Sequence, residues 1–222
     1  MTLAPPLPAA PSARHTLYPR FDATRIVGYM TDDAYFDFEN ASVEKHECYE
    51  GWVIAMPGSS PEHNLINGNV VGGLFVALQT AQTDCDVYTS DQKIYVSSRK
   101  YVYADATIVC GVAQFDEKDC LRNPSLIVEI LSPSTEENDR NDKFRAYRGI
   151  PSLRHYVLIE QFRPAVTHYE KQESGLWAIA GDYRELSDTL SFAVDGANAV
   201  LPLSTIYRRV SFPEPEISAS GA

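Results

Sequence analysis

One carboxylate stands out because it interrupts an apolar segment. Glu129 is the single ionisable residue in the run Leu126 to Leu131 (LIVEIL), which is followed directly by Ser132-Pro133-Ser134-Thr135. The aliphatic and β-branched composition of this run predicts a buried strand. A carboxylate within a buried strand is costly unless it is paired with a cation or binds one. Glu129 is therefore the first candidate for a functional site.

A second acid lies in another strand-like segment, residues 101–112. Alternation with a period of two places Tyr103, Asp105 and Thr107 on one face of the expected strand. If this strand pairs with the strand that carries Glu129, the two carboxylates converge at one edge of a sheet. Two carboxylate oxygens close together are ligands that a hard cation such as Mg²⁺ requires.

The segment after Glu129 predicts a helix with a cation on it. Ser134 and Glu137 have the spacing of a capping box, and the helix is expected to run to about Tyr147. Asp139, Lys143 and Tyr147 are four residues apart and so share one helix face. The flexible Lys143 side chain could carry its ammonium group back toward the strand carboxylates.

Each of these residues also has a purely structural interpretation. Glu129 could be a buried acid satisfied by Lys143 or by backbone donors, and Asp105 could be a strand-end acid that bonds a turn. Asp139 and Lys143 could form an ordinary exposed helix ion pair, worth a few tenths of a kcal/mol. Two strand carboxylates and a lysine so close in the sequence favour a common site over three unrelated roles.

Composition indicates a folded globular protein. The chain has 222 residues, of which 44% are hydrophobic and 22% charged, close to the average for soluble domains. We expect one domain over residues 25–210, with flexible tails at 1–24, which is Pro-rich, and at 211–222. No apolar run is long enough for a membrane helix, and the N-terminus lacks the pattern of a secretory signal. A cytoplasmic protein is expected.

The four cysteines and the net charge narrow the possible functions. Cys48, Cys85, Cys110 and Cys120 lie far apart without a CxxC pair, so we expect reduced and mostly buried thiols rather than a zinc site or a disulfide framework. The net charge of −11 argues against non-specific nucleic-acid binding by bulk attraction. A nucleic-acid role would need a local site, metal ions or an oligomer that gathers basic residues.

The periodicity of apolar residues predicts an α+β (α/β) fold with a mixed central sheet flanked by helices. A hairpin is expected to turn at Glu50-Gly51, and the strands after residue 155 are expected to be antiparallel because short spacers separate them. The expected helices span 28–40, with Thr31 as N-cap, then 61–82 and 134–147, and the expected strands span 87–96, 101–112, 125–131, 155–159, 165–169, 177–180 and 189–194.

The chain resembles the Uma family of restriction endonucleases, within the PD-(D/E)XK nuclease superfamily. The resemblance covers residues 28–207 and is carried mainly by the segment EILSPST (129–135) and the helix after it, with Glu50-Gly51 and His63 upstream. It implies a restriction-endonuclease-like core and additional antiparallel C-terminal strands. It also implies a homodimer that acts on nucleic acid, with DNA as the expected substrate, although the residues themselves do not distinguish DNA from RNA.

The resemblance assigns roles to individual residues. Asp105 and Glu129 would be metal ligands, with the backbone carbonyl of Ile130 and Glu50 as further ligands. Lys143 would replace the lysine that other members of the superfamily carry two residues after the acid, because that position is Leu131 here. The proline of the PD element is also missing, and Ala104 stands in its place.

Two of these residues have weaker support. His63 could touch a phosphate or a metal-bound water, or it could be a structural histidine at the start of its helix. Glu50 could equally be an exposed turn residue.

The resulting hypothesis is hydrolysis of a phosphodiester with Mg²⁺ or Mn²⁺. One alternative is a nuclease fold that has lost catalysis and acts as an interaction or structural protein. Another is a metal-dependent hydrolase of a small phosphorylated molecule, which fits the acidic composition better but has no motif of its own.

Overall fold

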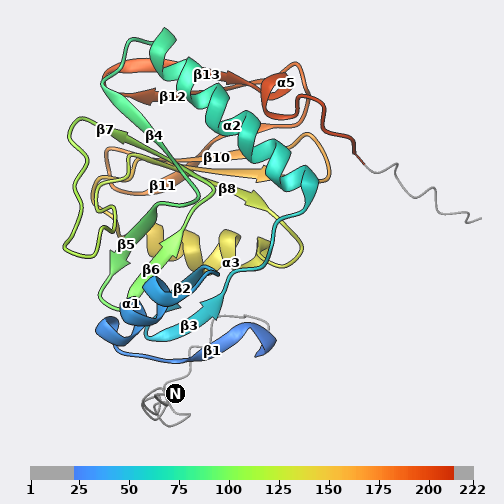
Figure 1. Ribbon diagram of the computed structural model, residues 1–222. Coiled ribbons are helices and arrows are strands. Elements are labelled where there is room, and N and C mark those ends of the chain that lie inside the picture. Colours follow the sequence, from blue (N-terminus) through green and yellow to red (C-terminus); the bar gives the residue numbers. More distant parts are fainter. Residues whose placement is uncertain (1–22, 213–222) are drawn as a thin grey trace, which may run out of the picture.

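Two β-sheets meet in the middle of the molecule, and the chain passes between them three times (Figure 1). The structure is a computed structural model that describes residues 23–212. The larger sheet has the order β11-β10-β9-β8-β7-β4, the smaller sheet has the order β1-β3-β2-β6-β5, and β12 and β13 form a separate hairpin. The strands are β1 (Ile26–Tyr29), β2 (His46–Tyr49), β3 (Trp52–Ala55), β4 (Cys85–Thr89), β5 (Lys93–Ser97), β6 (Lys100–Tyr103), β7 (Ala106–Cys110), β8 (Leu126–Leu131), β9 (His155–Glu160), β10 (Val166–Lys171), β11 (Trp177–Tyr183), β12 (Thr189–Val194) and β13 (Ala197–Pro202).

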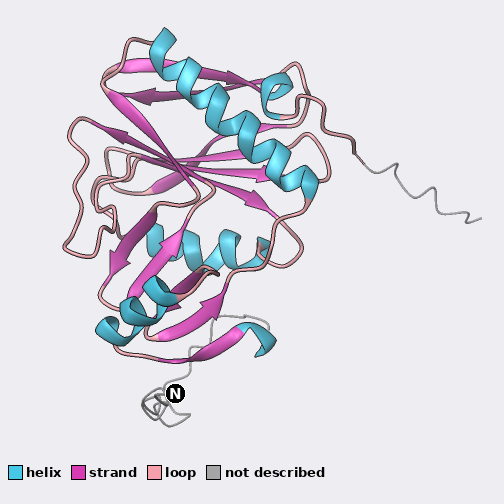
Figure 2. Ribbon diagram, in the orientation of Figure 1, coloured by secondary structure: helices cyan, strands magenta, loops and turns pink. Residues whose placement is uncertain are grey.

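The described part of the chain has fewer helices than strands, and the helices lie against the sheets (Figure 2). The longest is α2, and a second helical stretch consists of α3, a π-helical segment η3 and α4, which follow one another directly. None of the helices in the described part of the chain is long and apolar enough to cross a membrane. The helices are η2 (Ala23–Arg25, a 3-10 turn), α1 (Asp32–Ala41), α2 (Pro61–Thr80), α3 (Glu136–Asn138), η3 (Asp139–Lys143), α4 (Phe144–Tyr147) and α5 (Leu203–Ile206).

Strand β8 is the central element because it contributes to two cores. Val128 and Ile130 are buried in a core built with α2, α5 and the β12–β13 hairpin. Ile127 and Leu131, on the opposite face, are buried in a core that includes Tyr147 and residues of the smaller sheet. Glu129 therefore lies on the face that looks toward the helical stretch 136–147.

The predicted fold class is confirmed. In the larger sheet β8 and β9 are parallel, whereas the other strand pairs are antiparallel, so the sheet is mixed. The helix with Thr31 as N-cap, the hairpin at Glu50-Gly51 and the long helix after Ser60 are also present. The predicted tails fall almost entirely outside the described residues, and the extent of a single domain over 25–210 stays a prediction.

Two predicted strands were wrong in the same way. Residues 87–96 and 101–112 each form two strands, one in each sheet, instead of one. The chain leaves the smaller sheet after Tyr103 and enters the larger one at Ala106, so Asp105 lies in the connection and not within a strand. Its carboxylate accepts a hydrogen bond from the backbone N–H of Ile130 at 2.6 Å. Continuous apolar composition conceals this change of sheet, because both strands are buried.

The predicted start of the second helical stretch also needs correction. The helix begins at Glu136 with Thr135 as N-cap, and no side chain caps it, so Ser134 and Glu137 do not form a capping box. The Thr135 hydroxyl instead bonds the Ser132 hydroxyl at 3.0 Å. Hydroxyl groups thus stabilise the turn that separates Glu129 from the helix. The strands β1 and β13 and the short helices η2 and α5 were not predicted, and the helix expected over 28–40 begins only at Asp32 because residues 26–29 form β1.

The expectation of reduced cysteines was wrong for two of the four residues. Cys85 and Cys110 face each other as register partners in the β4–β7 pair and form a disulfide. Cys48 and Cys120 are free and buried, as expected. The pairing was not visible in the sequence because it depends on the register of two strands that are 25 residues apart.

Removing the disulfide should destabilise the protein measurably. We expect the Cys85→Ser/Cys110→Ser double variant to lose about 3 kcal/mol of unfolding free energy, because the bond restricts a loop of this length in the unfolded chain. Urea unfolding measures the loss, and reducing agent should reproduce it in the wild type but leave the variant unchanged. Four reactive thiols in the unreduced, denatured wild type, in place of two, would contradict the disulfide.

Two buried histidines hold the β12–β13 hairpin against the larger sheet. His155 Nε2 lies 2.8 Å from the carbonyl oxygen of Ala193, which can only accept, so this nitrogen donates. His155 Nδ1 must then accept from His168 Nε2, 3.0 Å away. Burial lowers the pKa of His155 and, together with the neighbouring ring, lowers the pKa of His168 to about 4. Both rings are neutral in the folded protein at neutral pH.

This pair predicts a loss of stability in mild acid. The unfolded chain binds protons at both histidines near pH 6.5, whereas the folded protein resists them, so stability falls as the pH drops from about 6.5 toward 4. We expect the decrease to be on the order of 2 kcal/mol larger in wild type than in His168→Gln. Urea unfolding at pH 7.5 and 4.5 measures both, and equal pH dependence would rule out this role.

Candidate active site

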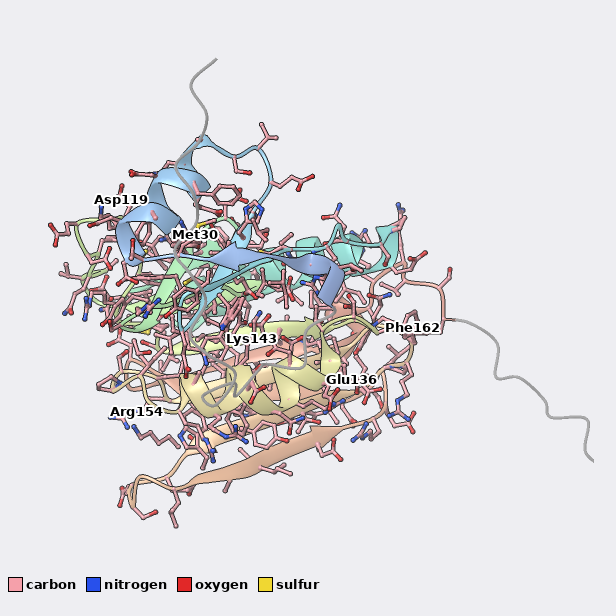
Figure 3. The ribbon with its side chains drawn as sticks, turned by 90° about the horizontal axis from the view of Figure 1, so that it is seen from below. Met30, Asp119, Glu136, Lys143, Arg154 and Phe162 are labelled. Atoms are coloured by element: carbon pink, nitrogen blue, oxygen red, sulfur yellow. A yellow bond between two sulfur atoms is a disulfide. The ribbon has the colours of Figure 1, made fainter. Side chains whose placement is uncertain are left out.

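A buried ammonium group, that of Lys143, is the centre of the candidate site. Its Nζ lies 3.1 Å from Glu129 Oε1 and 3.1 Å from Glu47 Oε1. It also donates to the carbonyl oxygen of Tyr103 at 3.1 Å and lies 3.6 Å from Asp139 Oδ1. Figure 3 shows Lys143 on the helical stretch where that stretch faces the sheets. The predicted approach of the lysine to the strand acid is present.

The electrostatics of this group follow from burial. Lys143, Glu129 and Glu47 are each less than 10% exposed, as is Asp139. Burial raises the pKa of Glu129 well above its ordinary value, and it raises the pKa of Asp139 to about 6. Burial alone would lower the pKa of Lys143, but Glu129 and Glu47 together outweigh it and raise that pKa. The lysine is therefore a fixed cation at neutral pH.

The helical stretch brings three side chains to this point. Asp139, Lys143 and Tyr147 are spaced by four residues, and the Tyr147 hydroxyl donates to Glu129 Oε1 at 2.8 Å. The segment Asp139–Lys143 is π-helical, a local widening that is frequent at functional sites. Tyr156 donates from its hydroxyl to the carbonyl oxygen of Asp139 at 2.9 Å, which fixes this turn against β9.

Asp105 and His63 form a second pair beside the lysine cluster. Ser60 caps α2 by accepting from the backbone N–H of His63, which sets His63 in the first turn. The ring Nε2 of His63 is 3.0 Å from Asp105 Oδ1. Burial lowers the pKa of His63, but the hydrogen bond and charge of Asp105 outweigh this and leave the pKa raised. The carboxylate of Asp105 thus favours the protonated state of the His63 ring that faces it.

Both groups line one cavity. It has a volume of about 220 Å³ and lies where the two sheets, the start of α2 and the helical stretch meet. Its walls carry both ionisable side chains and neutral polar side chains. The ionisable residues are His63, Asp105, Glu129, Asp139 and Lys143, and the polar neutral residues are Ser59, Ser60, Ser90, Ser132, Ser134, Thr135 and Gln161.

Glu50 is not part of this group. It lies at the hairpin turn with a positive φ of 53° and is exposed, and it does not line the cavity. Glu47, three residues earlier in β2, contacts Lys143 instead, and its Oε1 also accepts from the backbone N–H of Tyr103 at 3.1 Å. Sequence reasoning missed Glu47. The sequence gives little signal for Glu47, because its strand (HECY, residues 46–49) is short and contains polar residues, although the structure buries all four of them.

The side chains around the cavity fit a hard cation. Asp105, Glu129 and Ile130 all line it, and the buried Asp139 Oδ1 has no hydrogen-bond partner. Within residues 23–212, no three His, Cys, Asp or Glu side chains are grouped as a ready-made metal site. Mg²⁺ commonly binds through one or two carboxylates and keeps water or phosphate oxygens as its other ligands. Asp105 and Glu129, two carboxylates that line the same cavity, are donors of this kind.

Removing the lysine should leave buried negative charge uncompensated. We expect Lys143→Met to lower the unfolding free energy by about 3 to 5 kcal/mol, the usual effect of breaking a buried ion pair from one side. Adding Glu129→Gln should restore part of this stability, because a neutral amide needs no cation. Urea unfolding of the single and double variants measures the coupling.

Arg145→Met provides the control, because Arg145 is exposed and forms a surface pair with Asp142. Its loss should change stability by less than about 1 kcal/mol. If Lys143→Met were as mild as this control, the buried lysine would not hold the cluster together.

A comparison with solved structures identifies the fold. A putative nuclease of the DUF820 group from Anabaena variabilis has a similar fold, with a TM-score of 0.57, 14% sequence identity, and coverage of 75% of this chain and 91% of that chain. At this identity the likeness concerns the fold alone. The fold is nuclease-like.

The sequence then places the chain in a family. Residues 32–196 match the model of the Uma2 family, described as "Putative restriction endonuclease", and the chain belongs to this family. Two uncharacterized proteins from Synechocystis sp. are similar. The protein slr1290 is 33% identical over 189 residues, covering 82% of this chain and 94% of its own length, and sll1609 is 32% identical over 153 residues, covering 68% and 85%. The resemblance noted from the segment EILSPST is confirmed.

Proposed function

We propose that the protein is a metal-dependent endonuclease that hydrolyses phosphodiester bonds of DNA. The observation that carries this proposal is that Asp105, Glu129 and Lys143, from the β6–β7 connection, strand β8 and the helical stretch, line one cavity. Membership of a restriction-endonuclease family supports the reaction type. The net charge of −11 also favours a metal-dependent reaction, because such a chain repels a polyanion unless a local cation offsets the repulsion.

In this proposal Asp105, Glu129 and the carbonyl of Ile130 would hold Mg²⁺ or Mn²⁺. A metal ion bound there would lower the pKa of a water molecule and polarise the phosphate. The chain's own groups then position the substrate. Ser132, Ser134 and Thr135 line the same cavity as the acids, and their hydroxyl groups can donate to phosphate oxygens.

Lys143 acts as a cation and not as a base, because its neighbours keep it protonated. Its ammonium lies against Glu129, so it can orient a water molecule beside that carboxylate or offset charge that develops on the phosphate. Glu47 is a positioning residue in this scheme. It holds the ammonium from the opposite sheet and accepts from Tyr103.

A cleavage assay tests the proposal. Purified protein should cut DNA with Mg²⁺ or Mn²⁺ and not with EDTA, and Glu129→Ala or Lys143→Ala should reduce cutting by at least about 100-fold, the usual effect of losing a charge-stabilising group. Glu47→Gln should impair cutting, whereas Glu50→Gln should leave it near wild type, because only Glu47 contacts the lysine. Circular dichroism checks that each variant is folded.

Other outcomes would favour the alternatives. Cutting that persists in both Glu129→Ala and Lys143→Ala would point to another site. Hydrolysis of bis(p-nitrophenyl) phosphate without cleavage of any DNA or RNA would indicate a hydrolase of small phosphorylated molecules. A wild type that is silent on all these substrates would favour an inactive nuclease fold.

A further inference from the structure

A second cavity lies directly beside the candidate active site. Its volume is about 390 Å³, and Asp105 belongs to the walls of both cavities, together with the loop after β3 and Ser90. The other polar residues of this second cavity are Glu44, Lys45, Asn64 and Asn67. A ligand in the second cavity would therefore lie directly beside a group bound at Asp105 in the first cavity.

We propose that this second cavity holds the nucleobase next to the cleaved phosphate and that Asn67 recognises it. This proposal rests on the proposed function, because it uses Asp105 as the point of cleavage. The expected ligand is a base that presents a hydrogen-bond donor and an acceptor side by side, as adenine does.

The two asparagines are placed for such contacts. Asn64, which directly follows His63, and Asn67, about one turn further along, are three residues apart and so lie on the same side of α2. Asn67 Oδ1 is buried and has no hydrogen-bond partner. Burial of an unsatisfied polar group is unfavourable, and a ligand donor would satisfy it once the side chain rotates toward the cavity.

A third asparagine on the same helix shows what a structural role looks like. Asn69 Nδ2 donates to the carbonyl oxygens of Ile206 at 3.0 Å and Arg208 at 2.9 Å, and so fixes the C-terminal segment on α2. Neither of those acceptors lies near the second cavity. Asn67 has no such anchor for its oxygen.

The charges of the cavity favour a base over a phosphate. Asp105 and Glu44 are acidic, and the one basic side chain in its wall, Lys45, is paired with Asp91 and the carbonyl oxygen of Ser90. Neutral carboxamides are the remaining recognition groups. A carboxamide offers a donor and an acceptor together, which is how asparagine and glutamine recognise adenine. The phosphate is then left to the neighbouring cavity, where Lys143 and the hydroxyl groups lie.

Binding of 2′-deoxyadenosine 5′-monophosphate tests the proposal without requiring cleavage. Isothermal titration in Ca²⁺ should show binding to wild type, at least tenfold weaker binding to Asn67→Ala, and a similar loss in Asn67→Asp, which keeps the shape but removes the donor. Gln79→Ala, an exposed residue on the same helix away from both cavities, should bind as wild type does. Urea unfolding shows whether each variant is intact.

A second measurement separates this proposal from the proposed function. Sequencing of the ends cut from random-sequence DNA should show a base preference at one position beside the cleaved bond, and Asn67→Ala should flatten it. If no DNA is cut but the nucleotide still binds through Asn67, the nuclease proposal fails and the base site stands. If binding and base preference are the same in wild type and Asn67→Ala, the base site is overturned.

Discussion

The buried ammonium group of Lys143 is the interaction on which the arrangement depends. It contacts Glu129 from β8 in the larger sheet, and Glu47 from β2 and the carbonyl of Tyr103 from β6 in the smaller sheet. A cation in the interior is tolerated only when its partners are held in place. The two sheets and the helical stretch must therefore meet at one point. That point is also where the chain changes sheet and Asp105 is exposed to the cavity.

The same cluster contains more acidic than basic groups. Glu129, Glu47 and Asp139 surround a single lysine, and Asp105 lies close enough to raise the pKa of both Glu129 and Asp139. An excess of buried acid is unfavourable in the protein alone. A divalent cation beside Asp105 and Glu129 would relieve that excess, which gives the acidic composition a local reason. Without a metal ion, the hydroxyl group of Tyr147 partly compensates the carboxylate of Glu129 by donating a hydrogen bond to it.

Much of this could be predicted from the sequence, and the failures have physical causes. Glu129 and Lys143 were accessible because a charge in an apolar strand and a four-residue helix spacing are local patterns. The change of sheet around Asp105 was not, because both flanking strands are buried and look alike in composition. The Cys85–Cys110 bond depends on strand register. Glu47 was overlooked in favour of Glu50, since a short strand next to a turn gives little alternation to reveal which acid points inward.

Leu131, two residues after Glu129 in β8, is buried in the core beside Tyr147 and Ile127. An apolar side chain therefore packs at this position of the strand. A lysine at position 131 would enter that apolar core, where burial of an unpaired charge is unfavourable. The hydrophobic core thus dictates which element can carry the cation, and the helical stretch supplies it through Lys143, which meets Glu129.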